Sequence, residues 1–235
     1  MTFAQQIEFL WSVRGRFIEG LGISLIIAFF ALIIGFIIGV IMAIIKIAPK
    51  INFFIKFLDK IVDIYIAVIR GTPMLVQLLI MYSVVFVSMK TASTNLMIPI
   101  FSFGINSGAY MAEIIRSGIN SVDKGQMEAG RSLGLTWLGT MRKIIIPQAI
   151  KVVIPTIFNE IIILVKETSI VCYIVLNVND VQKWDLLGVA EDMAYVQAGA
   201  YMSALFVAAI MYLVVVLILT FIQKTIERRL SKNER

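Results

Sequence analysis

The chain alternates long apolar runs with short polar segments that carry most of its charges. Five runs stand out, at about residues 20–45, 71–89, 96–115, 152–175 and 198–222. A bilayer core of about 30 Å needs roughly 20 mostly apolar residues in a helix. The pattern therefore predicts an all-α integral membrane protein with five transmembrane helices, organised as a single transmembrane domain over residues 1–235.

Two of these runs contain charges that a lipid-facing helix would not tolerate. The third run ends near Glu113, and the fourth is interrupted by Glu160, Lys166 and Glu167. A charge at the bilayer centre costs about 2.5–3.5 kcal/mol even on insertion scales, so such side chains should face protein or a wet cavity. The candidates for a substrate path are Tyr110, Glu113, Asn159, Glu160, Lys166, Glu167 and Thr168.

A structural role is open for the same charges. Glu160 can pair with Lys166 or with Arg116, and Lys166 can be balanced by Glu167. Glu113 and Arg116 are three residues apart, so they share a helix face and favour an intrahelical pair. The path-lining and ion-pair interpretations of Glu160 are both retained.

Two further features concern the packing of the helices. Residues 50–70 alternate charged and apolar positions at helical spacing, which fits either an amphipathic helix at the inner interface or the first turns of the second span. The pairs Gly35/Gly39 and Gly104/Gly108 have a spacing that permits close helix approach, although such pairs are common by chance in apolar runs.

The composition supports a membrane protein and excludes several other classes. Hydrophobic residues make up 60% of the chain and charged residues 15%, with a mean hydropathy of +0.93, whereas a soluble domain has about 45–50% apolar and about 25% charged residues. The chain has no histidine and one cysteine, Cys172, which argues against a metal cluster or a disulfide framework. The basic residues bracket the apolar runs, so the net charge of +6 indicates membrane orientation and not nucleic acid.

The distribution of Lys and Arg predicts which way the chain crosses the membrane. Most of them lie in the segments 46–60, 124–151 and 224–235, and basic loops stay on the cytoplasmic side. We therefore expect the N-terminus outside and the C-terminus inside, as an odd number of spans requires. The first residues lack the pattern of a cleaved signal peptide.

The segment "EAGRSLGLTWLGTMRKIIIPQA", from Glu128 to Ala149, is polar and broken by glycines. Gly134 is a natural end for a first short helix, because glycine accepts the left-handed conformation. Thr136 can cap a second helix, from Trp137 to about Ile146, and Pro147 then disturbs the backbone. Leu133, Leu135 and Trp137 would be exposed near the tip, either as an anchor for a partner or packed on the protein's own spans.

This segment resembles the EAA signature of ABC importer permeases. The matching positions are Glu128, Ala129, Gly130, Gly134, Ile144, Ile146 and Pro147, with Gly130 in place of the usual third alanine and Ile146 in place of leucine. The stretches "IRGTPMLVQ", "SGAYMAEIIRSGI", "GQMEAGRSLG" and "VKETSIV" also look like the polar amino acid permease family, which carries histidine, glutamate, glutamine, arginine and opines. The resemblance covers roughly residues 20–225.

The resemblance implies a type I ABC importer permease fold in the bacterial plasma membrane. Its implied partners are ABC ATPase subunits, an extracellular or periplasmic solute-binding protein, a second permease subunit in a homodimer or a heterodimer, membrane lipid and the amino acid. The loop at about 120–148 becomes the coupling helix between the third and fourth spans. The implied ATPase-coupling residues are Glu128, Ala129, Gly130, Leu133, Gly134, Leu135 and Trp137.

The chain has no GxxxxGK[ST] phosphate loop, so ATP and Mg²⁺ are expected on the partner ATPase and no cofactor in this chain. The carboxylate of Glu160 favours a cationic amino acid, unless a basic side chain neutralises it. Two alternatives remain: an ATP-independent secondary transporter or channel, which would leave the ATPase-docking signature without a purpose, and a membrane enzyme, for which the chain offers no nucleophile elbow or metal ligands.

Overall fold

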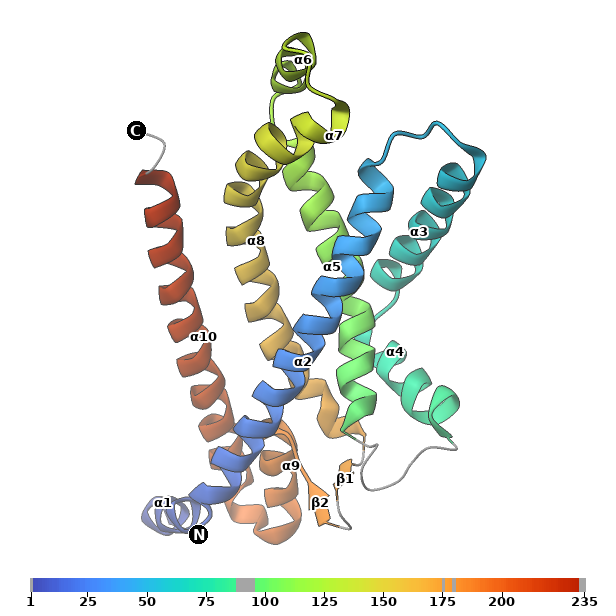
Figure 1. The fold of residues 1–235 in the computed structure, drawn as a ribbon. Coiled ribbons are helices and arrows are strands. Elements are labelled where there is room, and N and C mark those ends of the chain that lie inside the picture. Colours follow the sequence, from blue (N-terminus) through green and yellow to red (C-terminus); the bar gives the residue numbers. More distant parts are fainter. Residues whose placement is uncertain (1, 88–95, 175, 179–180, 233–235) are drawn as a thin grey trace. The chain divides into compact units, whose positions relative to one another are not determined.

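The computed structural model describes residues 2–87, 96–174, 176–178 and 181–232. Residues 88 and 89 of the predicted second span and residues 233–235 of the basic tail lie outside this part. The α-helices are α1 (Phe3–Ser12), α2 (Arg14–Ile47), α3 (Phe53–Gly71), α4 (Met74–Ile80), α5 (Met97–Asn120), α6 (Lys124–Ser132), α7 (Trp137–Thr140), α8 (Ile146–Glu167), α9 (Leu186–Val196) and α10 (Tyr201–Lys232) (Figure 1).

Shorter elements link these helices. Two π-helical turns, Met81–Val85 and Met141–Ile145, follow α4 and α7, and two 3₁₀ turns, Thr168–Tyr173 and Ala198–Ala200, follow α8 and precede α10. The strands β1 (Leu176–Val178) and β2 (Val181–Lys183) pair antiparallel, with Leu176 opposite Lys183. This hairpin and the helices α1 and α9 are additions to the helices expected from the apolar runs.

Three stretches of the described chain are long and apolar enough to cross a membrane: Arg14–Ile47, Trp137–Tyr173 and Tyr201–Leu230. The pair Phe53–Gly71 and Met74–Val85 would be a fourth if it forms one span, because it bends by 106° at a short break. Helix α5, which covers the predicted third span, is not among them, since polar and charged residues dilute its apolar sequence. The count of five spans stays a prediction.

The chain divides into two compact units, each built from separate segments of sequence. Unit 1 comprises Met1–Ile34, Thr72–Ile105 and Ile161–Thr220, and unit 2 comprises Gly35–Gly71, Asn106–Glu160 and Phe221–Arg235. The prediction of one permease domain over 1–235 is not tested by this division. The two units are described separately below.

Unit 1 has two apolar clusters. The first gathers residues of α2, α4, α5 and α8 around the fully buried Ile27, Leu78 and Phe103. The second joins the start of α2 to α9 and α10 around Phe17, Leu186 and Met193. Because α1 and α9 contribute apolar side chains to this second cluster, tertiary packing stabilises two helices that the sequence pattern did not single out.

In unit 2, α2 and α5 approach closely through glycines. A Cβ atom added to Gly39 would lie 2.4 Å from the Cβ of Met111, and one added to Gly35 would lie 2.8 Å from the Cβ of Ser107. From the other side, a Cβ on Gly108 would lie 2.7 Å from Cγ2 of Ile38. The close helix approach predicted from the glycine spacing is confirmed, because no larger side chain fits at these positions.

Candidate functional site

Helix α6 ends in a turn that fixes the direction of the following chain. Gly134 has a φ of 82°, the left-handed region that glycine enters without steric penalty. The N–H of Leu135 donates to the carbonyl of Gly130 at 3.1 Å, and the N–H of Gly134 donates to the carbonyl of Arg131 at 3.0 Å. These two bonds form a Schellman motif, which confirms Gly134 as the predicted end of the first short helix.

The second short helix begins as predicted and then continues into α8. The hydroxyl of Thr136 accepts from the N–H of Gly139 at 3.1 Å, which caps the start of α7. The π-helical turn Met141–Ile145 follows, and α8 begins at Ile146, so Pro147 lies in the first turn of α8 and breaks no helix. A proline removes one backbone hydrogen bond from a continuing helix, and the π turn directly before it is the irregular part of this one.

The α6–α7 segment projects beyond the ends of α5 and α8 (Figure 1). Within it, a Cβ on Gly130 would lie 2.5 Å from Cγ2 of Thr140, so the missing side chain lets the two short helices touch. Leu133 is 81% exposed and Leu138 is 68% exposed. These two leucines, here called the tip leucines, are the large apolar side chains that the segment presents outward.

The other predicted coupling residues take different places. Glu128 and Ala129 are exposed on α6, Gly130 is buried, and Leu135 and Trp137 are half-buried. A cavity of about 540 Å³ lies beside this segment. It is lined by Lys46, Ile47, Ile119, Asn120, Val122, Asp123, Lys124, Met127, Trp137, Met141 and Ile145. Trp137 thus faces its own protein, and Leu138, which the sequence analysis left out, takes the exposed position.

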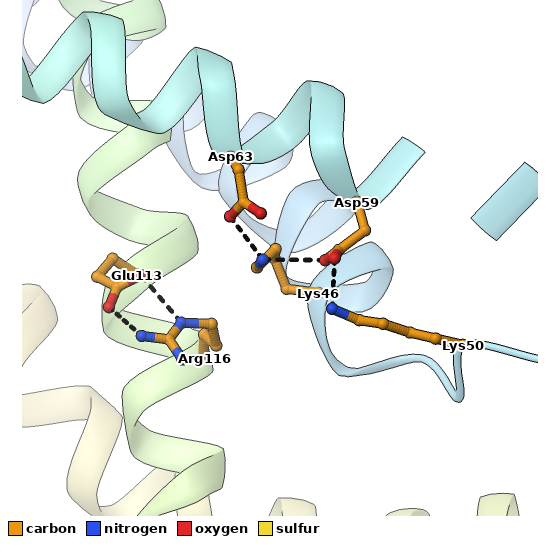
Figure 2. A network of polar contacts seen from close by, with 6 residues as sticks. All are labelled: Lys46, Lys50, Asp59, Asp63, Glu113 and Arg116. Atoms are coloured by element: carbon orange, nitrogen blue, oxygen red, sulfur yellow. Dashed lines mark hydrogen bonds and ion pairs between the residues drawn. The ribbon is translucent and has the colours of Figure 1, made fainter. Parts of the chain in front are cut away.

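A network of ion pairs joins α2 to α3 in unit 2. The Nζ atom of Lys46 lies 2.9 Å from a carboxylate oxygen of Asp59 and 2.6 Å from one of Asp63. Lys50 also pairs with Asp59. Figure 2 shows Lys46 between the two aspartates. Because Asp59 and Asp63 are four residues apart on one face of α3, a single lysine can hold both.

On α5, Glu113 and Arg116 form the predicted intrahelical pair. Nε of Arg116 donates to Glu113 Oε2 at 3.0 Å, and Nη2 donates to Oε1 (Figure 2). Arg70 of α3 places its guanidinium 5.2 Å from the ring centroid of Tyr110, a cation–π distance. Tyr110 and Glu113, both candidates for the path, therefore each have a basic neighbour.

Glu160 is buried in unit 2 and has a neutral hydrogen-bond donor. The Oγ atom of Ser107, on α5, donates to Glu160 Oε1 at 3.0 Å. Asn159 is exposed, and its Oδ1 accepts from Nε2 of Gln223, on α10, at 3.0 Å. Arg116, one of the two basic residues proposed to pair with Glu160, instead pairs with Glu113.

The remaining path candidates belong to unit 1. Lys166 is exposed, Glu167 is half-buried, and Thr168 is buried with its hydroxyl donating to the carbonyl of Val165 at 2.7 Å. In the described part of the chain, no group of three or more His, Cys, Asp or Glu side chains is arranged to hold a metal ion.

A buried carboxyl begins α9 in unit 1. Asp185 is fully buried, and its Oδ2 accepts from the N–H of Leu187 at 3.1 Å as the helix cap. The N–H of Leu186, the first residue of α9, donates to Oγ of Ser24 on α2 at 3.1 Å. Burial raises the pKa of Asp185 to about 7, although the backbone N–H groups at the helix start lower it in part.

Three contact residues were missed by sequence reasoning: Ser107, Arg70 and Gln223. Ser107 lies in the same row of small residues as Gly104 and Gly108, a pattern that by itself indicates only close helix packing. Gln223 follows directly after the predicted fifth span, where a polar residue was taken as the end of the membrane. Arg70 was taken as a boundary for the same reason.

The comparisons identify the relatives of this chain. Residues 35–232 match the family of binding-protein-dependent transport system inner membrane components. The arginine transport system permease protein ArtQ of Bacillus subtilis (strain 168) is 40% identical over 176 residues, which cover 73% of this chain and 75% of the relative. The putative glutamine transport system permease protein GlnP of Rickettsia felis is 37% identical over 169 residues, covering 72% and 74%.

A solved structure agrees with these relatives over nearly the whole chain. It is the crystal structure of an amino acid ABC transporter with histidines, at a TM-score of 0.83 and 35% identity, covering 97% of this chain and 99% of that one. The fold is that of a type I ABC permease. The ATP-independent transporter considered from sequence is set aside, because this match is to an ABC transporter. The chain belongs to the family of binding-protein-dependent transport system inner membrane components and is the permease subunit of an ABC amino acid importer.

Proposed function

We propose that this permease subunit forms the path for a cationic amino acid and is driven by an ATPase that docks on the tip leucines. Family membership implies ATPase partners and a multi-pass location in the inner membrane. The proposal adds the docking residues, the orientation, the class of substrate and a second permease subunit. ATP and Mg²⁺ are held by the ATPase, and the chain itself needs no cofactor.

The exposed tip leucines are the observation that carries the docking proposal. Leu133 and Leu138 are 81% and 68% exposed, next to the mostly polar helix α6. Burial of a leucine side chain against a partner stabilises a complex by about 1.5–3 kcal/mol. The Schellman motif at Gly134 and the cap at Thr136 hold both leucines on a rigid turn, so little conformational freedom is lost on docking.

The continuity of α7 with α8 suggests how a movement of the α6–α7 segment is transmitted to the membrane. Helix α7, the π-helical turn and α8 form one continuous stretch, Trp137–Tyr173. Movement of a docked ATPase would therefore act directly on α8, which carries Asn159 and Glu160. Glu128 and Ala129 lie exposed on α6 and would border the docked surface, while Gly130, Leu135 and Trp137 support it from within.

We assign five spans: α2, the bent pair α3 and α4, α5, α8 and α10. The N-terminus then lies outside and the C-terminus in the cytoplasm, with the basic α6–α7 segment on the ATPase side. The two units belong to one permease domain in this proposal. A solute-binding protein delivers the amino acid from outside, lipid surrounds the spans, and nucleic acid has no part.

The substrate class follows from Glu160. Its carboxylate is buried and accepts a hydrogen bond from Ser107, and a carboxylate inside an apolar segment is expected to face protein or a wet cavity. A guanidinium or ammonium group would form charge-assisted hydrogen bonds with it. The relative named as an arginine permease supports a cationic substrate. Tyr110, Glu113, Asn159, Lys166, Glu167 and Thr168 are the further candidates for the path.

The docking proposal is tested on the complex with its ATPase and binding protein in liposomes. Leu133→Asp and Leu138→Asp should each reduce substrate-stimulated ATP hydrolysis at least tenfold and weaken co-purification of the ATPase. Asn52→Asp places the same charge on the exposed α2–α3 loop and should leave both measurements unchanged. Full coupling in both leucine variants would refute docking on these residues.

The substrate proposal is tested by the same assay with different amino acids. In the intact complex, arginine or lysine should stimulate ATP hydrolysis more than glutamine does. Glu160→Gln should lower stimulation by the cationic amino acid at least tenfold, whereas Glu191→Gln, an exposed acid on α9, should not. If cationic and neutral amino acids stimulated ATP hydrolysis equally in wild type and in Glu160→Gln, Glu160 would have no role in recognising a cationic substrate.

A further inference from the structure

A purely apolar groove runs along unit 2 between α2, α5 and α8. Its volume is about 360 Å³, within the range of about 300–1,000 Å³ that ligand pockets occupy. It is lined by Phe36, Val40, Ile115, Ile119, Ile146, Ala149, Ile150, Val153, Ile154 and Ile157. No polar side chain takes part, so the groove suits a hydrocarbon chain and not an amino acid.

The groove is open along one side. Ala149 and Val153 form a buried floor, whereas Phe36, Ile146 and Ile150 are exposed at its margins. Two of the three helices that form it, α2 and α8, belong to stretches that are long and apolar enough to cross a membrane. An apolar surface of this kind matches the hydrocarbon of a bilayer, because lipid tails are as apolar as leucine side chains.

Two cations mark one end of the groove. Arg142 and Lys143 belong to the π-helical turn that directly precedes Ile146, so they lie at the end of the groove that Ile146 lines. Both are exposed, and neither forms an ion pair with another residue in the described ranges. By contrast, the neighbouring Lys46 and Arg116 are already paired with carboxylates.

We propose that an anionic phospholipid binds here, with an acyl chain in the groove and its phosphate between Arg142 and Lys143. The apolar groove matches the acyl chain of such a lipid, and the two adjacent cations match its phosphate. Basic sites between spans on the cytoplasmic side hold anionic headgroups. The site rests on the proposed cytoplasmic position of the α6–α7 segment. It differs from the tip leucines, which point to the ATPase.

The test measures lipid retained by the detergent-purified transporter complex in native mass spectrometry. Phosphatidylglycerol and phosphatidylcholine with identical acyl chains are titrated separately. Wild type should retain phosphatidylglycerol at concentrations at least tenfold lower than phosphatidylcholine. Arg142→Gln/Lys143→Gln should abolish that preference, while Lys224→Gln/Arg229→Gln, which removes two exposed charges from α10, should keep it.

A second pair of variants tests the groove itself. Ile150→Trp fills the groove and should reduce retention of both lipids, whereas Val152→Trp, also exposed on α8 but outside the groove lining, should not. Equal binding of the two lipids by wild type, or full retention in Ile150→Trp, would overturn the proposal. Cross-links from the groove to a second permease or to the ATPase would overturn it too, because a protein would then fill the site. Lipid binding is read without transport, so a failure of the ATPase assignment would leave this result intact and separately visible.

Discussion

Gly134 shows how much one backbone angle decides. Its φ of 82° is disfavoured by about 1–2 kcal/mol for residues with a Cβ, and asparagine is among the few that tolerate it. A Cβ would meet nothing within 4 Å, so the constraint is conformational and not steric crowding. The sequence predicted this turn correctly because the signal is local.

Two substitutions at this position should therefore differ in transport activity. Gly134→Asn should retain most of the transport activity, whereas Gly134→Val should lose at least tenfold, because the β-branched residue reorients the tip leucines. Substrate-stimulated ATP hydrolysis and membrane insertion are measured together for both variants. Equal activity of Asn and Val would contradict the role of the turn.

Asp185 gives a pH dependence with a defined sign. Its pKa is raised from 3.8 to about 7 by burial, so the folded protein holds this proton more tightly than the unfolded chain does. The contribution to stability is complete below about pH 4 and is lost as pH rises to about 7. Asp185→Asn stays neutral and can still cap α9.

The measurement is thermal unfolding of the purified protein in detergent at pH 5 and pH 8. Wild type should lose more stability between these two values than Asp185→Asn does. The comparison between the two proteins removes the contribution of the other carboxyl groups. A pH dependence that is the same in both would show that Asp185 is ionised without penalty.

The residues that touch the buried acids could not be derived from sequence. Glu160 was singled out because a charge in an apolar run is conspicuous, but its donor Ser107 is 53 positions away in sequence. Likewise, Leu138 is exposed at the tip while Trp137 faces the protein, and this difference depends on how α6 and α7 pack. Long-range packing carries no local signal in one sequence.

At the scale of elements, α3 and α4 show why apolar runs misplace boundaries. The predicted second span began after Arg70, because that charge ended the apolar run. In the structure α3 continues through Arg70 to Gly71, and the 106° bend follows before α4. Pro73 restricts Thr72 to extended backbone, so the sequence "GTP" indicates the helix break. The charged residues of α3 have partners in ion pairs and in the cation–π contact.

The contact between α2 and α5 gives a prediction at the same scale. Gly39→Leu would force side-chain atoms into Met111, and overpacking of this kind costs about 1–3 kcal/mol or more. Gly22→Leu, at a position with nothing within 4 Å of its added Cβ, is the matched control on the same helix. The unfolding temperature in detergent should be clearly lower for Gly39→Leu and unchanged for Gly22→Leu. A similar decrease of the unfolding temperature in both variants would argue against the tight contact.

For the whole molecule, the orientation can be tested with cysteine labelling because Cys172 is the only cysteine. In a Cys172→Ala background, we expect a membrane-impermeant maleimide to label Tyr195→Cys in intact cells and Gln126→Cys only in inside-out vesicles stripped of ATPase. Both positions are exposed, on α9 and α6. Labelling of Gln126→Cys from outside would reverse the assigned orientation.

The π-helical turn Met141–Ile145 has a consequence for the whole permease. A π turn contains one more residue than an α turn, and each residue of an α-helix advances the chain by roughly 100°. Deleting one residue there would restore a regular α turn and leave α7 at nearly the same angle about the axis of α8, whereas deleting one residue from the regular part of α8 would rotate α7, with Leu138, by about 100°. The π turn can therefore absorb a change of one residue in chain length, while the length of the regular helix fixes the direction in which the permease presents Leu138.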